Sequence, residues 1–99
     1  MRKIYVEPEM LIHSASKVDD SNSEFVRLRN KLNDDVDLLS SSWSGKDNRS
    51  FVEQVKANNP ILDNISIVLS QYSEFLRSTA QAYKQVQEEL ANEALKCRR

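Results

Sequence analysis

The sequence is poor in the residues that bend or cross-link a chain. Its 99 residues include one glycine, two prolines and one cysteine. Sandwiches and barrels need turn-forming residues at many positions, so this composition favours long helices. The single cysteine, Cys97, has no second thiol with which it could close an intrachain disulfide.

The sequence also lacks an excess of charge of either sign. Fourteen basic residues against fifteen acidic ones give a net charge of −1. Proteins that grip a phosphate backbone carry clustered positive charge, so nucleic acid is not an expected partner. Hydrophobic residues make up 39% of the chain and charged residues 29%, which indicates a folded protein with a limited core.

Targeting and membrane-spanning segments are missing as well. Residues 1–8 include two basic side chains, but no apolar core of a secretory signal peptide follows them. No stretch approaches the roughly 20 apolar residues that a transmembrane helix needs. Taken alone, these features favour a soluble, cytoplasmic protein.

Residues for catalysis or metal binding are scarce. His13 is the only histidine and lies far along the chain from Cys97, so the sequence lacks the parts of a thiol–imidazole dyad or metal site. Asp34, Asp35 and Asp37 form an exposed run, whereas acid–base chemistry needs carboxylates placed in a pocket. We therefore expect no enzymatic activity, no cofactor and no small-molecule substrate.

Apolar residues in the first half recur at alternating steps of four and three, which is the pattern of a heptad seam. The seam consists of Leu11, Ala15, Val18, Phe25, Leu32, Val36, Leu39 and Trp43. The pattern predicts a helix over about residues 8–42, and Pro8 suits its first position because proline fixes φ and needs no donor there. Asn22 and Arg29 interrupt the seam, and we expect such polar positions to set register or partner choice.

Apolar residues in the second half recur at the same alternating steps of four and three. Its seam consists of Phe51, Val55, Leu62, Ile65, Leu69, Tyr72, Leu76, Tyr83, Val86 and Leu90. We predict a helix over about residues 47–95 with a kink near Pro60, since proline removes a backbone donor and disfavours helical geometry at the residue before it. Residues 43–46, with the chain's only glycine, Gly45, would form the turn. The prediction is an all-α, antiparallel two-helix hairpin.

The second helix carries more apolar surface than the first can cover. An additional row at seven-residue spacing lies beside its seam: Ile61, Val68, Phe75 and Ala82. A lone hairpin would leave this row in water and forgo about 1.5 to 3 kcal/mol for each large side chain. We therefore expect residues 1–99 to form one domain that dimerises, with an identical or a different hairpin, into a four-helix bundle.

The turn contains a W-x-G tripeptide, Trp43-Ser44-Gly45, near the middle of a chain of about one hundred residues. With a long amphipathic helix on each side and Pro8-Glu9 opening the first, the whole chain resembles the WXG-100 (Esx-like) family. The resemblance implies a helical hairpin that dimerises, contacts the ATPase of a type VII secretion system and is secreted from the cytoplasm without a cleaved signal peptide.

The resemblance also implies an export signal shared between protomers, made of the W-x-G turn and a Y-x-x-x-D/E motif of the partner. It assigns recognition to Trp43, Gly45 and Tyr83, but the acidic position holds Gln87, and Glu88 follows one place later. Either Glu88 takes the place of the acidic residue of the motif, or the chain is an escort of a larger type VII toxin substrate that supplies the signal. Packing alone would also explain both aromatic residues, and a plain coiled-coil adaptor is a further alternative.

Overall fold

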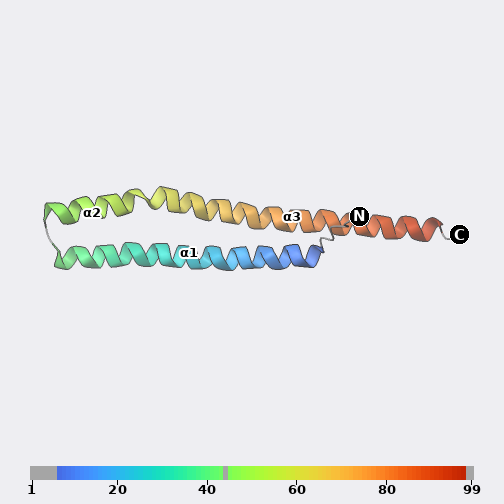
Figure 1. Ribbon diagram of the computed structural model, residues 1–99, viewed down its shortest axis with the longest axis horizontal. Coiled ribbons are helices and arrows are strands. Elements are labelled where there is room, and N and C mark those ends of the chain that lie inside the picture. Colours follow the sequence, from blue (N-terminus) through green and yellow to red (C-terminus); the bar gives the residue numbers. More distant parts are fainter. Residues whose placement is uncertain (1–6, 44, 98–99) are drawn as a thin grey trace, which may run out of the picture.

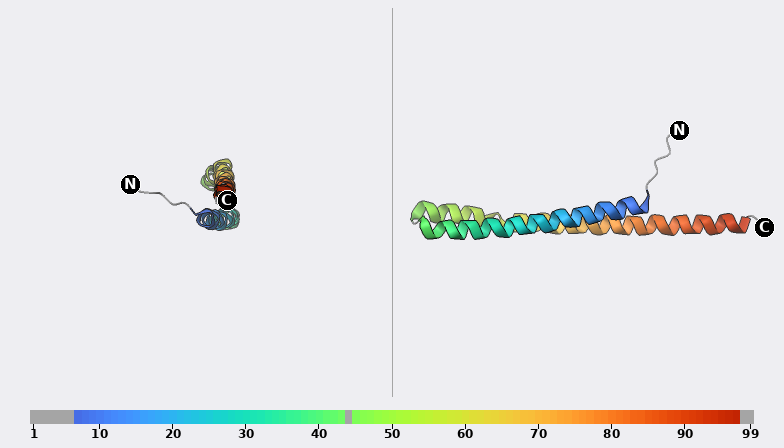
Figure 2. Two further views of the ribbon diagram at one scale, coloured as in Figure 1. Left: turned by 90° about the vertical axis from the view of Figure 1, so that its right-hand side faces the viewer. Right: turned by 90° about the horizontal axis from the view of Figure 1, so that it is seen from below.

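The computed structural model describes residues 7–43 and 45–97, which form a long helical hairpin (Figure 1). Its elements are α1 (Pro8–Ser42), α2 (Lys46–Ala57) and α3 (Asn59–Cys97). α1 forms one arm, and α2 followed by α3 forms an antiparallel second arm. Seen end-on in Figure 2, these residues make two arms side by side, and the molecule measures 83 × 22 × 18 Å. The predicted all-α hairpin is confirmed.

The ends of α1 follow from local backbone chemistry. Pro8 occupies the first turn, after an extended Glu7 whose φ and ψ are −86° and 129°. At the other end Trp43 is extended, with φ −123° and ψ 102°, and its N–H donates to the carbonyl of Leu39 at 2.9 Å. The chain therefore leaves the helix at the tryptophan of the W-x-G tripeptide.

The second arm consists of two helices. The break lies at Asn58, two residues before Pro60. The Asn58 N–H donates to the carbonyl of Val55 at 3.1 Å, three residues back, as in a 3₁₀ turn, and not four residues back as in an α-helix. Because proline has no N–H, the α-helical bonding cannot run unbroken through this stretch. The two helices nonetheless continue in nearly the same direction in Figure 1.

The contact line between the arms is thin and partly polar. Three of the described apolar residues are fully buried: Ala15, Val36 and Ala80. The other positions along the line are half-buried apolar residues, such as Phe25 and Leu62, alternating with small or polar ones, such as Asn59 and Ser66. Two helices can bury little surface against each other, so much of the apolar surface stays exposed.

The predicted seam is wrong at several positions. Four of its apolar residues lie on the flank of the contact line and are 42–54% exposed: Leu32, Leu39, Ile65 and Tyr72. The residue after each of them faces the opposite arm: Asn33, Ser40, Ser66 and Ser73. A straight α-helix has 3.6 residues per turn, so a strict 3.5-residue repeat drifts by about 20° per heptad away from the contact line.

Candidate functional site

The turn between the arms is set by Gly45. Its φ of 120° and ψ of −176° lie in a region that is essentially reserved for glycine. A β-carbon added there would meet no atom within 4 Å. The backbone conformation, and not crowding, therefore requires glycine at this position. The Gly45 carbonyl then accepts from the N–H of Arg49 at 3.2 Å, in the first turn of α2.

Trp43 packs against α2 while part of its indole stays exposed. Its ring centroid lies 5.8 Å from that of Phe51, and the two ring planes are tilted by 43°, a favourable aromatic arrangement. Trp43 remains 38% exposed and Phe51 39%. The tryptophan thus combines a packing contact with a surface that another protein could reach.

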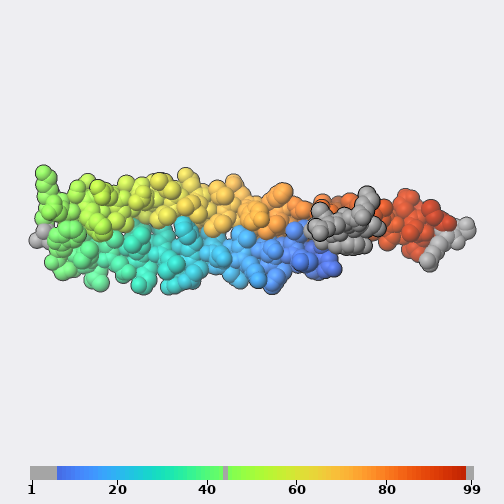
Figure 3. All heavy atoms as spheres, viewed as in Figure 1, coloured from blue at the N-terminus to red at the C-terminus, as the bar shows by residue number. Residues whose placement is uncertain are grey.

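The C-terminal part of α3 extends beyond α1, as Figures 1 and 3 show. Lys84 lies near the start of α1, with its Nζ 3.9 Å from Oε1 of Glu9. From there to Cys97 the helix continues for about 20 Å at 1.5 Å per residue, and residues 81–97 are all exposed. We call residues 85–97 the tail, since nothing in the described hairpin covers them.

Tyr83 and Glu88, the expected parts of the C-terminal motif, both lie at this exposed end of α3. Tyr83 is 44% exposed, and Glu88 is exposed as well. Five residues on a helix correspond to a rotation of about 140°, so these two side chains leave the helix on nearly opposite sides, whereas Gln87 is only about 40° from Tyr83. The structure therefore does not bring the tyrosine and the carboxylate together.

The turn and the tyrosine also lie at opposite ends of the hairpin, because Lys84, next to Tyr83, pairs with Glu9 at the start of α1, whereas the turn follows the other end of α1. From the start of α2 at Lys46 to Tyr83 the arm rises by about 55 Å. Trp43 and Tyr83 of one chain therefore cannot form a common surface.

A continuous apolar row runs along the outside of α3. We call it the outer row, and it consists of Ile61, Ile65, Val68, Tyr72, Phe75, Thr79, Ala82 and Val86. Each member up to Ala82 directly precedes a residue at or next to the contact line, so the row lies about 100° around the helix from that line, and Val86 continues it into the tail. Two shallow apolar grooves lie along it, one lined by Ile61, Ile65 and Val68, the other by Phe75, Ala82 and Val86.

The four residues expected at a dimer interface, Ile61, Val68, Phe75 and Ala82, are all exposed members of the outer row. The heptad pattern predicted Ile65 and Tyr72 on the inner seam, but both are exposed and complete this row. A usable signal was the small or polar residue that follows each of them at seven-residue spacing, Ser66 and Ser73. Small residues there let two helices approach closely.

The side of α3 that bears the outer row carries no charge between residues 60 and 87. The charged residues of this stretch lie on the opposite half of the helix: Asp63, Glu74, Arg77 and Lys84.

None of the described helices has the length of apolar sequence that crossing a bilayer requires.

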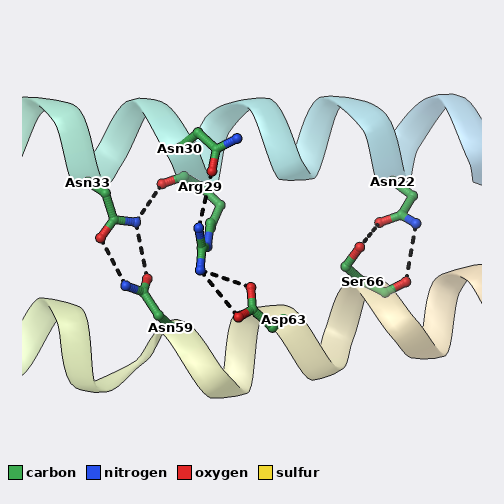
Figure 4. Close-up of polar contacts among 7 residues, drawn as sticks. All are labelled: Asn22, Arg29, Asn30, Asn33, Asn59, Asp63 and Ser66. Carbon is green, nitrogen blue, oxygen red and sulfur yellow. Dashed lines mark hydrogen bonds and ion pairs between the residues drawn. The ribbon is translucent and has the colours of Figure 1, made fainter.

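The seam residues Asn22 and Arg29 are paired within the hairpin (Figure 4). Asn22 donates to the Ser66 carbonyl at 3.1 Å and accepts from the Ser66 hydroxyl at 2.7 Å. Arg29 lies 3.0 Å from a carboxylate oxygen of Asp63. These contacts give both residues a role in joining the arms, and their role in partner choice stays a prediction.

Further polar contacts also join the arms. Asn33 and Asn59 exchange side-chain amide hydrogen bonds of 3.1 and 3.0 Å (Figure 4). Asp19 lies 2.7 Å from Arg77. The pKa of Asp19 is lowered, first by a hydrogen bond from Ser73 and then by the one from Arg77, because both stabilise the ionised carboxylate.

The comparisons with known proteins agree with this geometry. The sequence model of the WXG100 family, described as proteins of 100 residues with WXG, matches residues 3–88. EsxA of Geobacillus thermodenitrificans has a similar structure, with a TM-score of 0.81 and 19% identity over 90% of this chain and 98% of that one. The secreted protein EsxB of Bacillus anthracis strain Sterne has a TM-score of 0.78 and 21% identity over 88% and 99%.

No curated protein sequence matches the chain. At these identities the two solved structures establish the shared hairpin fold, while the family model establishes kinship. Because that model spans most of the sequence, including the W-x-G turn, the chain belongs to the WXG100 family of small, non-enzymatic helical proteins associated with type VII secretion.

Proposed function

We propose that this chain is a substrate of a type VII secretion system and is exported, without a cleaved signal peptide, as a dimer with another WXG-type hairpin. The observation that carries the proposal is that the exposed Trp43 turn and the exposed Tyr83 lie at opposite ends of one hairpin. Two hairpins packed antiparallel would bring the turn of one beside the tail of the other, so dimerisation would complete a recognition surface.

In this proposal each residue has a separate task. Gly45 fixes the turn, and Trp43 offers its exposed indole edge to the secretion ATPase. Tyr83 of the partner supplies the other part of the same surface, and Glu88 lies in the tail just beyond it. The protein waits in the cytoplasm before export and acts outside the cell afterwards, through binding and without a cofactor.

A second candidate function is escort of a larger type VII toxin substrate. The angle of about 140° between Tyr83 and Glu88 favours it, because the acidic group does not stand beside the tyrosine. In this case the partner carries the complete signal, and this chain contributes its apolar surface and its turn.

The proposal is tested by export of Trp43→Ala from a Gram-positive strain that carries the matching secretion system. We expect the variant to remain in the cells, as measured by immunoblots of cells and culture medium. Phe51→Ala is the matched control, because it removes the same aromatic pair from the α2 side and leaves the indole in place. If Phe51→Ala abolishes export equally, packing and not recognition explains the tryptophan.

The tail is tested by Gln87→Glu, which places a carboxylate about 40° from Tyr83. Increased export would show that the chain uses its own signal, and Gln85→Glu controls for the added charge. Export of a chain truncated after Val86, in the presence of its partner, would favour the escort function. Retention of a truncated chain that still binds its partner, as shown by co-purification from the cells, would favour an autonomous substrate.

A further inference from the structure

We infer that α2 is a lid over Trp43. It detaches from α1 as a unit, while α1 and α3 stay paired, and thereby uncovers the face of the indole that packs on Phe51. Opening would present the whole indole, so this use of the lid rests on the proposed recognition of Trp43. The motion itself belongs to the hairpin and can be measured without a secretion system.

A hinge lies at each end of α2. At its start, Gly45 occupies a backbone region that gives the chain freedom closed to other residues. At its end, the Asn58 N–H bonds three residues back, and Pro60 has no N–H to donate to the carbonyl of Lys56. The regular hydrogen bonding of α2 does not continue into α3, so α2 can move without unwinding α3.

Few contacts hold α2 against α1. Its side chains on the contact line are Asn48, Val52 and Val55, and the two valines are only half-buried. Its ion pair with α1 joins Lys56 to Asp37 at 2.8 Å, but both side chains are about half-exposed, and exposed pairs contribute little to stability. With 12 residues, α2 is also too short to be stable as an isolated helix. These features make α2 the most easily opened of the described helices.

Asn48 lowers the cost of opening. The heptad positions that follow it on the second arm hold large apolar residues: Val55, Leu62, Leu69 and Leu76. Asn48 is 6% exposed, and its Oδ1 has no hydrogen-bond partner among the described residues. A buried acceptor without a partner is unfavourable, whereas water would satisfy this oxygen once α2 detaches. Opening therefore relieves an unfavourable burial that the closed hairpin maintains.

Trp43 is the side chain that the lid covers. Its N–H is bonded to the carbonyl of Leu39, so Trp43 stays with α1 when α2 moves. Its ring packs on Phe51 of α2, with the centroids 5.8 Å apart. Detachment of α2 removes the Phe51 ring and exposes the indole face beneath it. A partner that binds the whole indole would select the open state, and its apparent affinity would follow the open fraction.

Hydrogen exchange in the full chain measures the opening. At one protein concentration, the amides of residues 49–57 should be at least about tenfold less protected than those of residues 66–80, because the latter exchange only when the hairpin unfolds. Leu69→Ala weakens the pairing of α1 with α3 in both the closed and the open state. It should speed exchange of residues 66–80 by about tenfold and change residues 49–57 by less than about twofold. Equal acceleration of both segments would overturn the inference, because α2 would then unfold only with the rest of the hairpin.

Asn48→Leu should hold the lid closed. It removes the unpartnered oxygen and places an apolar side chain on the contact line, so exchange of residues 49–57 should slow by about tenfold or more. Ser50→Leu, at an exposed position of α2, is the matched control, because it brings a similar gain in helix propensity and leaves the contact line unchanged. Equal slowing in the two variants would assign the effect to propensity and overturn the role of Asn48.

Export separates the lid from the proposed function. In the Gram-positive strain that carries the matching secretion system, Asn48→Leu should reach the medium in smaller amounts than Ser50→Leu, because its open fraction is smaller. Equal export of the two variants would overturn the use of the lid in recognition. Normal export of Trp43→Ala would instead overturn the proposed function, and the exchange measurements would still decide whether α2 opens.

Discussion

At the scale of single residues, Gly45 has the strictest requirement in the described chain. Its backbone adopts a conformation that L side chains rarely take, in open space and next to an aromatic pair that holds the turn. The sequence allowed this glycine to be placed in the turn, since it is the only one in the chain. It did not show which conformation the glycine adopts, because several turn geometries would use glycine equally well.

We expect Gly45→Ala to lower the free energy of unfolding by about 1 to 3 kcal/mol, the usual cost of holding another residue in this region of backbone space. Urea unfolding followed by circular dichroism measures the loss. Lys46→Ala, at the exposed first position of α2, is the control and should change stability by less than about 0.5 kcal/mol. If Gly45→Ala leaves the free energy of unfolding unchanged, the turn can adopt another conformation at little cost.

Asp19 should make the stability of the folded state depend on pH. Its lowered pKa means that the folded state favours the ionised carboxylate, through Ser73 and Arg77. The stabilisation is therefore present above the ordinary aspartate pKa, near 3.9, and disappears as the pH falls through the lower pKa of the folded state. Asp19→Asn should unfold at lower urea than the unmodified protein at pH 7, and the difference should shrink as the pH falls through the lowered pKa of the folded state.

Asp20→Asn, at the exposed neighbouring position, is the control for removing a charge from the same turn of α1. The midpoints of urea unfolding at pH 7, 5 and 2.5 provide the measurement. A difference between Asp19→Asn and the unmodified protein that does not shrink from pH 7 to pH 2.5 would assign the effect to packing.

At the scale of the helices, the arms are held in register by polar contacts. The heptad pattern predicted two long amphipathic helices, because apolar periodicity is a strong signal over such lengths. It could not separate the inner line from the outer row of α3. Both have the same spacing, and both contain large apolar residues, so only the size of residues such as Ser66 and Ser73 distinguishes them.

The contact between Asn22 and Ser66 can be measured with a double-mutant cycle. We expect Asn22→Ala and Ser66→Ala to be coupled by about 0.5 to 1.5 kcal/mol, the usual worth of a hydrogen bond that joins two elements. All variants are unfolded at one protein concentration, because association would otherwise change the apparent stability. Coupling of Asn22 with the exposed Ser70 should be close to zero.

A coupling near zero between Asn22 and Ser66 would remove the reason to regard Asn22 as a residue that joins the arms. A change of binding partner in Asn22→Ala, with the coupling intact, would support the predicted role in partner choice as well. The two roles are compatible, because a residue that aligns the two arms also aligns the apolar surfaces that the arms present to a partner.

At the scale of the whole molecule, the arms differ in length. The sequence indicated this through the longer apolar pattern of the second half, but it could not show how much of that half α1 covers. The covered length depends on where the start of α1, at Pro8, lies beside α3. Contacts between the arms, such as that of Glu9 with Lys84, determine this position.

A chain truncated after Val86 should keep its hairpin and dimerise more weakly. The tail contacts nothing in its own hairpin, so the helix signal per residue should change little. Loss of Leu90 from both copies should raise the Kd of the dimer by roughly tenfold to a hundredfold, given about 0.7 to 1.4 kcal/mol for each partly buried leucine. Analytical ultracentrifugation measures the Kd.

The matched control is a chain that ends at Lys96, which loses Cys97 and the residues after it but keeps Leu90. Equal affinity in both truncated chains and the full chain would show that the tail does not contribute to association.

The length of the hairpin also governs how the protein behaves in flow. Its radius of gyration is 23.0 Å, whereas a compact protein of this size would have one of about 13 Å. A rod of this shape has a larger frictional coefficient than a sphere of equal mass, and its end-over-end rotation is slow. A single hairpin will therefore elute from a sizing column near the volume of a considerably heavier globular protein, and NMR relaxation will report anisotropic rotation even for a monomer.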